Sequence, residues 1–295
     1  ALAEIRRTKR SQDISCQEAN ADSPYICCPE GINATGVYGC SGWPFGDDFK
    51  GGALPSVVPV SRFSAHSVKQ SAWPGDPVWQ VAGAIIADEV VKRTGDVDAA
   101  NDFFPMASGV VDFFARHGDA LGAGGLINYG FENDWLAIEL CTPPARPWAT
   151  PGTRCVLANQ SAASAQIAGT VAVLSLAKAR GNAPDVSKYS ELLAKLKTAY
   201  HSTFFNASAG HYIGDYQTAQ LLPLFFNVTP PPFTKTVADF LVESVTAPGG
   251  PVHDARRSCN GTVPCLATGF WGSRYALQVL SSHGHPGLAL QLATK

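Results

Sequence analysis

The sequence predicts an all-α fold built from antiparallel helical hairpins. From Trp79 onward, apolar residues recur with the 3.6-residue period of amphipathic helices. Short polar turns at 95–96, 181–185 and 282–285 join these segments, and short connections make consecutive helices antiparallel. Alternating strand patterns are scarce, with only brief candidates such as 211–213.

The individual helices follow from apolar stripes, Asp or Thr starts and Gly stops. After a first helix over 1–12, we expect helices over 78–94, 97–116, 161–180, 185–205, 216–226, 234–245, 268–282 and 286–294. Pro105 predicts that the helix over 97–116 begins near Asn101 or kinks there, and Gly118 is expected to end it.

Consecutive hairpins of this kind form either an α-solenoid or a closed toroid. No fixed-period repeat is visible, which disfavours the solenoid. We therefore expect one helical domain over 1–295, with residues 11–59 as a Cys-, Gly- and Pro-rich excursion within it.

Composition excludes several classes of function. Hydrophobic residues make up 45% of the 295-residue chain and charged residues 16%, which favours a large core over disorder. A net charge of −2 gives no electrostatic footprint for nucleic acid. No apolar stretch is expected to approach the roughly 20 residues that span a bilayer. There is no C-x-x-C pair, so neither a metal site nor a cofactor is expected.

Cysteines and sequons indicate the secretory pathway. Cys141 with Cys155, and Cys259 with Cys265, each flank a loop and are typical of disulfides. The connectivity of the other four, Cys16, Cys27, Cys28 and Cys40, stays open. Five N-x-S/T sequons, at Asn33, Asn159, Asn206, Asn227 and Asn260, exceed the one or two expected by chance and favour a secreted glycoprotein. No signal peptide is visible at Ala1.

The stretch 130–136 is the main candidate site. It places Glu132, Asp134 and Trp135 within four residues. A sugar ring stacks on indole through its apolar face, and carboxylates bind its hydroxyls. The alternative is an acidic surface loop in which Trp135 anchors the following helix.

Five motifs occur in a fixed order along the chain, at 52–59, 75–79, 131–136, 216–224 and 268–284. This order resembles the catalytic domain of the bacterial-type α-L-rhamnosidases, the six-hairpin glycosidases of glycoside hydrolase family 78. The resemblance implies an (α/α)6 toroid that removes terminal α-L-rhamnose with inversion. It also implies that Asp76, Trp79, Asp134 and Trp135 line the sugar site, with a rhamnose-containing glycoside or polysaccharide as partner.

Two expected motifs of that family are missing. Its general acid lies in a Cys-Pro-Gln-Arg-Asp-Glu-Arg type motif, and its general base in a Thr-x-Trp-Glu motif, and neither is found. About nine helices are predicted where a six-hairpin barrel needs twelve. We therefore expect a toroid incomplete at both ends, with no catalytic residue within the chain. Glu132 and Asp134 are then expected to bind substrate hydroxyls and shape the charge near the reacting centre.

Two alternative functions remain. One is a non-catalytic or truncated carbohydrate-binding toroid, and the other is a six-hairpin glycosidase of different sugar specificity. Core packing is an equally good explanation for Trp79 and Trp271. Helix capping or lining is a better explanation than substrate contact for Gln217 and Gln220, and His253, His283 and His285 are expected to be ordinary surface residues.

Overall fold

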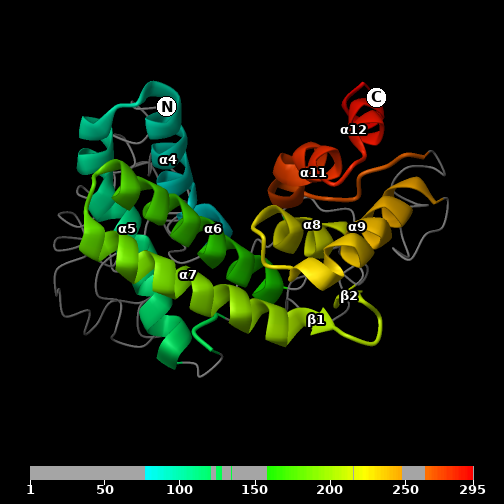
Figure 1. The fold of residues 1–295 in the computed structure, drawn as a ribbon, viewed down its shortest axis with the longest axis horizontal. Helices are drawn as coiled ribbons and strands as arrows, with labels where there is room; N and C mark the ends of the chain where they lie inside the picture. Colours follow the sequence, from blue (N-terminus) through cyan, green and yellow to red (C-terminus); the bar gives the residue numbers. More distant parts are fainter. Residues whose placement is uncertain are drawn as a thin grey trace, which may run out of the picture. The chain divides into compact units, whose positions relative to one another are not determined.

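The computed structural model describes residues 77–120, 124–127, 134, 158–214, 216–247 and 263–294. This part of the chain is helical apart from one two-stranded hairpin (Figure 1). The first helix over 1–12 and the excursion over 11–59 lie outside the described residues, so both stay predictions.

Most described helix ends agree with the sequence pattern to within three residues. The helix predicted over 97–116 ends four residues later, and the one predicted over 78–94 is interrupted at Val81. The described helices are α3 (Pro77–Gln80), α4 (Ala82–Thr94), α5 (Val97–Ala120), α6 (Ala158–Ala179), α7 (Ala183–Phe204), α8 (Gln217–Phe225), α9 (Pro231–Thr246), α11 (Phe270–Ser282) and α12 (Pro286–Ala293). Strands β1 (Phe205–Asn206) and β2 (His211–Tyr212) pair antiparallel, with Phe205 opposite Tyr212.

Helix α5 begins at the first residue of its predicted range, not near Asn101, and ends four residues later than predicted. It begins at Val97 because the Asp96 carboxylate accepts a hydrogen bond from the Ala99 N–H at 2.9 Å, as an N-cap residue does. Pro105 therefore lies inside the helix, on its exposed side. The helix also continues past Gly118 to Ala120.

Gly118 does not end the helix. Its lack of a side chain lets the backbone of Gly125 pack closely against α5. A Cβ built on Gly118 would overlap the carbonyl group of Gly125. The Gly125 carbonyl accepts a hydrogen bond from Gln166 Nε2 at 2.9 Å, and the Ile127 N–H donates to Gln166 Oε1 at 3.1 Å. The fully buried Gln166 amide thus holds the backbone of residues 125–127 against α5, at a point where only a glycine fits at position 118.

The chain divides into two compact units. The first comprises the described residues within 77–127 and 165–196, and the second comprises residue 134 and the described residues within 158–164 and 197–294. Within the first unit, α4 and α5 pack against each other. Its core consists of fully buried apolar side chains of α5, α6 and α7, among them Phe103, Val111, Phe113, Phe114, Ile167, Val173, Leu176 and Leu196.

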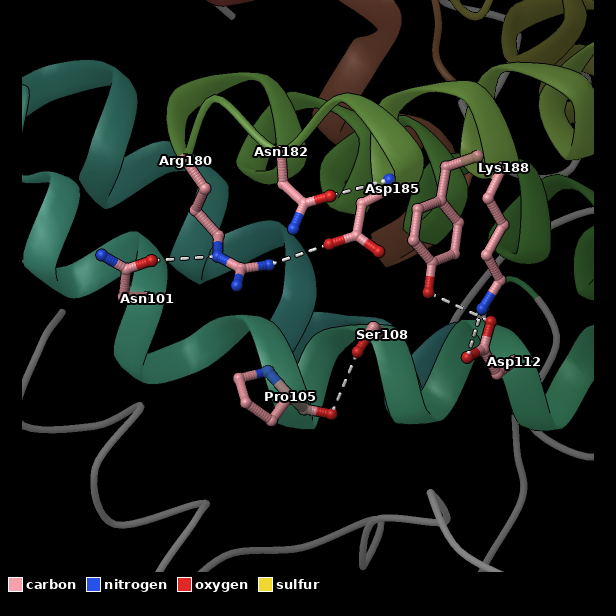
Figure 2. Close-up of polar contacts among 9 residues, drawn as sticks. Asn101, Pro105, Ser108, Asp112, Arg180, Asn182, Asp185 and Lys188 are labelled. Carbon is pink, nitrogen blue, oxygen red and sulfur yellow. Dashed lines mark hydrogen bonds and ion pairs between the residues drawn. The ribbon is translucent and has the colours of Figure 1, made fainter.

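Polar contacts on the surface of this first unit tie α7 and the end of α6 to α5 (Figure 2). Arg180 donates to Asn101 Oδ1 at 3.0 Å and pairs with Asp185 at 3.1 Å. Lys188 pairs with Asp112 at 2.8 Å. Because these groups are partly exposed, each ion pair contributes only about 0–1 kcal/mol, so the apolar core supplies most of the stability.

The second unit contains the β-hairpin, α8, α9, α11 and α12. Helix α8 packs against both α9 and α11, and α11 packs against α12. Aromatic rings fill the space beside the hairpin: Tyr200 lies 4.8 Å from Phe204 and 5.7 Å from Tyr212, measured between ring centroids. All three side chains are buried.

The expectation that no apolar stretch approaches membrane-spanning length was wrong for α6. Residues Asn159–Ala179 are long and apolar enough to cross a bilayer, the only helix in the described ranges that is. However, 78% of the apolar window is buried inside the protein, as in the core helix of a globular fold. The expectation that the protein has no membrane partner stays a prediction.

We expect Tyr200→Phe to leave the free energy of unfolding unchanged or to raise it by up to about 1 kcal/mol. Among the described residues, the buried Tyr200 hydroxyl makes no hydrogen bond of good geometry, so its removal ends a desolvation cost. The matched control is Tyr189→Phe. The Tyr189 side chain is also buried, but its hydroxyl donates to the partly exposed Asp112 Oδ1 at 3.1 Å, and loss of this hydrogen bond should cost about 1 kcal/mol. Urea unfolding of both variants measures the difference, and equal losses would contradict the assignment.

Candidate functional site

Asp134 is the centre of a buried polar cluster in the second unit. Its side chain is 2% exposed and accepts four hydrogen bonds. Oδ2 accepts from the Thr218 hydroxyl at 2.5 Å and the Gly269 N–H at 2.8 Å, and Oδ1 from the N–H groups of Trp271 at 2.7 Å and Gly272 at 3.1 Å. Asp134 and these four donors form the Asp134 cluster. It connects the motif that contains Asp134 with the motifs at 216–224 and 268–284.

The carboxylate caps helix α11 from a distant part of the chain. Gly269 occupies the N-cap position and has no side chain with which to cap the helix. The first N–H groups of a helix have no partners within it, and the positive end of the helix dipole favours an anion. Asp134 supplies this anion from 135 residues away in the sequence.

Two effects act on the acidity of this group. Burial raises the pKa of the Asp134 carboxyl above its ordinary value of 3.8. The hydrogen bonds from Thr218, Gly269, Gly272 and Trp271 lower the pKa, because they favour the charged form. Burial is the larger effect.

Gly272 lets α11 approach the carboxylate closely. A Cβ built there would overlap Thr218 Oγ1 and lie 3.0 Å from both Asp134 Oδ2 and Thr268 Cβ. The small residue in the motif 269–272 therefore serves packing around Asp134.

The two glutamines of the motif at 216–224 bind backbone. Gln217 donates to the carbonyl oxygens of Ser244 and Cys265, at 3.2 and 3.1 Å, and accepts from the Ala267 N–H at 2.8 Å. Gln220 accepts from the Tyr212 N–H and donates to the Tyr212 carbonyl, each at 2.9 Å. Both side chains are fully buried, so they fix the loop before α11 and the hairpin in place.

Trp271 belongs to the core of the second unit. Its side chain is 6% exposed, and its indole N–H donates to Ser164 Oγ at 3.0 Å. The ring meets Tyr275 edge to face at 5.3 Å between centroids. The core-packing explanation for Trp271 therefore agrees with its surroundings.

The other predicted site residues are only partly visible. Trp79 lies half-buried in α3 of the first unit. Asp76, Glu132 and Trp135 lie outside the described residues, so their assignment to a sugar site stays a prediction. Among the described residues, no group of three His, Cys, Asp or Glu side chains could hold a metal ion.

The structure shows protein donors around the Asp134 carboxylate, and the direct sugar contact that we expected of it stays a prediction. An ionised carboxylate offers about four acceptor positions, and four protein donors occupy them. The sequence did not reveal Thr218, Gly269 or Gly272 as its partners. The sequence pattern starts this helix at residue 268, and only the structure shows that Gly269, which has no capping side chain, occupies the N-cap position.

We expect Gly272→Ala to lower the free energy of unfolding by about 1–3 kcal/mol, the usual cost of overpacking. The added Cβ would displace the Thr218 hydroxyl from the Asp134 cluster. A double-mutant cycle with Thr218→Ala tests this cause. Removing Oγ1 makes room for the Cβ, so the double variant should lose less than the sum of the single variants. Additive losses would contradict the proposed clash.

Comparison with known proteins gives a consistent result. A family model described as the bacterial alpha-L-rhamnosidase 6 hairpin glycosidase domain matches residues 45–295. An alpha-L-rhamnosidase of Streptomyces avermitilis is 29% identical over 217 residues, which cover 72% of this chain and 17% of that protein. The chain therefore spans about a sixth of the length of this curated relative.

Three solved structures share the fold. They are the Streptomyces avermitilis alpha-L-rhamnosidase complexed with L-rhamnose (TM-score 0.53, 22% identity), the Dictyoglumus thermophilum alpha-L-rhamnosidase (0.57, 23%) and the native Aspergillus terreus enzyme (0.51, 18%). They cover 70%, 75% and 70% of this chain, which in turn covers 17%, 22% and 22% of theirs.

These matches confirm the all-α fold class and the resemblance on which the expectation of a six-hairpin toroid rests. The model matches most of the chain. This protein therefore belongs to the family of bacterial alpha-L-rhamnosidase six-hairpin glycosidase domains.

Proposed function

We propose that the protein of which this chain forms part is an α-L-rhamnosidase that removes terminal α-L-rhamnose from rhamnosides with inversion of configuration. The family match over residues 45–295 carries this proposal. The substrate class follows from the relatives, one of which is described in complex with L-rhamnose.

In this proposal the proton-transferring groups lie outside the chain. Inverting hydrolysis needs a carboxylic acid and a carboxylate roughly 6.5–9.5 Å apart, with one free to protonate the leaving oxygen and the other to activate water. Asp134 can do neither while four protein donors occupy its oxygens. It acts as a positioning residue that holds its own point in the chain to the start of α11.

The stretch 130–136 remains the proposed sugar-binding segment. Trp135 would offer its indole face to the pyranose ring and Glu132 would bind its hydroxyls, while the roles that the resemblance implies for Asp76 and Trp79 stay predictions. Because Asp134 is held at one point in the chain, substitutions in the Asp134 cluster should affect catalysis indirectly, through the placement of its sequence neighbours.

The test is hydrolysis of an aryl α-L-rhamnoside by the full-length protein, with the aryl β-D-glucoside as control. We expect the rhamnoside to be cleaved and proton NMR to show β-L-rhamnose as the first product. Release of the α anomer first would overturn inversion. Cleavage of the glucoside alone would favour a glycosidase of other specificity.

A non-catalytic carbohydrate-binding toroid is the second candidate. The sequence leaves this candidate open, because the family's acid and base motifs are not found in it. Equilibrium dialysis with L-rhamnose separates the two candidates. Binding without hydrolysis by the full-length protein would support the binding protein and overturn the enzyme.

We further propose that the protein is secreted and contains disulfides. Support comes from the five sequons and from the paired spacing of the cysteines. Cys265 is buried at 5% exposure, and its proposed partner Cys259 lies outside the described residues. Maleimide labelling under denaturing conditions, before and after reduction, tests this. Labelling of all eight cysteines before reduction would overturn the disulfides.

A further inference from the structure

We propose that Asn206 carries an N-linked glycan in the folded protein and that Asn159 does not, although both occur in N-x-S sequons. The inference rests on the geometry of the two sites. It is independent of the rhamnosidase activity, and its test needs no catalysis.

Asn206 lies where β1 enters a tight turn that leads to β2. Its side-chain oxygen accepts from the Ser208 N–H at 3.1 Å, the Ser208 hydroxyl at 2.7 Å and the Ala209 N–H at 3.3 Å. The backbone closes the same turn, because Gly210 N–H donates to the Asn206 carbonyl at 2.8 Å. All these bonds to the side chain end on Oδ1, and none of them occupies Nδ2.

Glycan attachment occurs at this other atom. Nδ2 forms a bond to the anomeric carbon of a lipid-pyrophosphate-linked oligosaccharide, the carbon–oxygen bond to pyrophosphate breaks, and Nδ2 loses one proton. The product keeps Oδ1 unchanged as an acceptor, so all three side-chain hydrogen bonds of the turn survive. The hydrogen bond from the Ser208 hydroxyl also draws electrons from the amide, which favours loss of the Nδ2 proton.

The surroundings of Asn206 can hold a large hydrated group. Residues 206–209 are all exposed, so the glycan would extend into solvent from the tip of the hairpin. No burial of the sugar and no change in the strand pairing are required.

Asn159 has the opposite environment. It is half-buried in the first turn of α6, and the next two residues, Gln160 and Ser161, are fully buried. Side chains two positions apart on a helix do not face each other, so the Ser161 hydroxyl cannot reach the Asn159 amide as Ser208 reaches Asn206. A glycan at Asn159 would disturb the packing at the start of a core helix.

The experiment is to secrete the full-length protein from a yeast host and release its glycans with a glycan amidase in ¹⁸O-water. Each formerly occupied asparagine becomes a labelled aspartate that peptide mass spectrometry locates. We expect label at Asn206 and none at Asn159. Label at Asn159 equal to that at Asn206, or no label at Asn206, would overturn the proposal.

Matched variants guard against loss of folding. Asn206→Gln and Ser208→Ala should each remove one glycan from the secreted protein, seen as one step in gel mobility. Ser208→Thr keeps both the sequon and the hydroxyl donor, so it should keep the glycan. Asn159→Gln should leave mobility unchanged. A mobility step with Asn159→Gln would contradict the proposal.

Discussion

Asp134→Asn is expected to lower the free energy of unfolding by about 3 kcal/mol or more, as when a partner of a buried charged network is lost. The amide replaces one acceptor oxygen with an NH2 group. If the NH2 group replaces Oδ2, it faces the donors of Thr218 and Gly269. If it replaces Oδ1, it faces the N–H groups of Trp271 and Gly272. Urea unfolding followed by circular dichroism measures the loss.

The matched control is Asp119→Asn, which makes the same chemical change on the surface. Asp119 is 60% exposed and pairs with Lys195, so its loss should cost less than about 1 kcal/mol. In the full-length protein, Asp134→Asn should also reduce kcat/KM for an aryl rhamnoside. Wild-type stability in Asp134→Asn would exclude the capping role.

The pH dependence of stability provides a separate test of this carboxyl. Because burial raises the pKa of Asp134 in the folded chain, the folded state keeps the proton to a higher pH than the unfolded chain does. The contribution to the free energy of unfolding is therefore fully present below the ordinary pKa of 3.8 and is lost as the pH rises through the folded-state pKa. Relative to Asp134→Asn, the wild type should lose stability over this interval. A parallel pair of pH profiles would contradict the raised pKa.

Gly118→Ala should lower the free energy of unfolding by about 3 kcal/mol, at the upper end of overpacking costs. The new Cβ would overlap a backbone carbonyl, which cannot rotate away as a side chain can. Gln166 also holds this carbonyl in place at 2.9 Å. The gain in helix propensity from Gly to Ala, about 1 kcal/mol, is too small to offset this overlap.

Gly287→Ala is the control, because the same substitution is expected to raise the free energy of unfolding there. Gly287 lies exposed in α12, and a Cβ there meets nothing within 4 Å. The substitution should stabilise the protein by about 0.5–1 kcal/mol through reduced backbone entropy in the unfolded chain. If thermal unfolding shows both alanine variants to be stabilised, the close approach at Gly118 is wrong.

Local sequence signals predicted the helices well because those signals act over only a few residues. Gly95 and Gly181 end their helices in the left-handed conformation, as expected of Gly stops. Gly118 carries the same sequence signal but meets Gly125, a residue outside its helix. A glycine that allows a turn and one that allows a close approach look alike until the tertiary neighbour is known.

The candidate site shows the same limit. The residues 131–136, 216–224 and 268–284 could be recognised as motifs, and their order indicated the family. From the sequence, Asp134 was expected to bind a sugar or to lie in an acidic surface loop, and Gln217 and Gln220 were expected to cap or line helices rather than contact substrate. Their hydrogen bonds in the second unit connect them to backbone and to Thr218.

The sequence by itself determined the all-α class, the order of the helices and the family, because periodicity, helix stops and motif order are written along the chain. Only the tertiary structure decided that Asp134 caps α11, because the unpaired N–H groups of that helix lie 135 or more residues away in sequence. A carboxylate has the same chemistry whether its donors come from a sugar or from a helix. Only the fold brings the N–H groups of α11 to the Asp134 carboxylate.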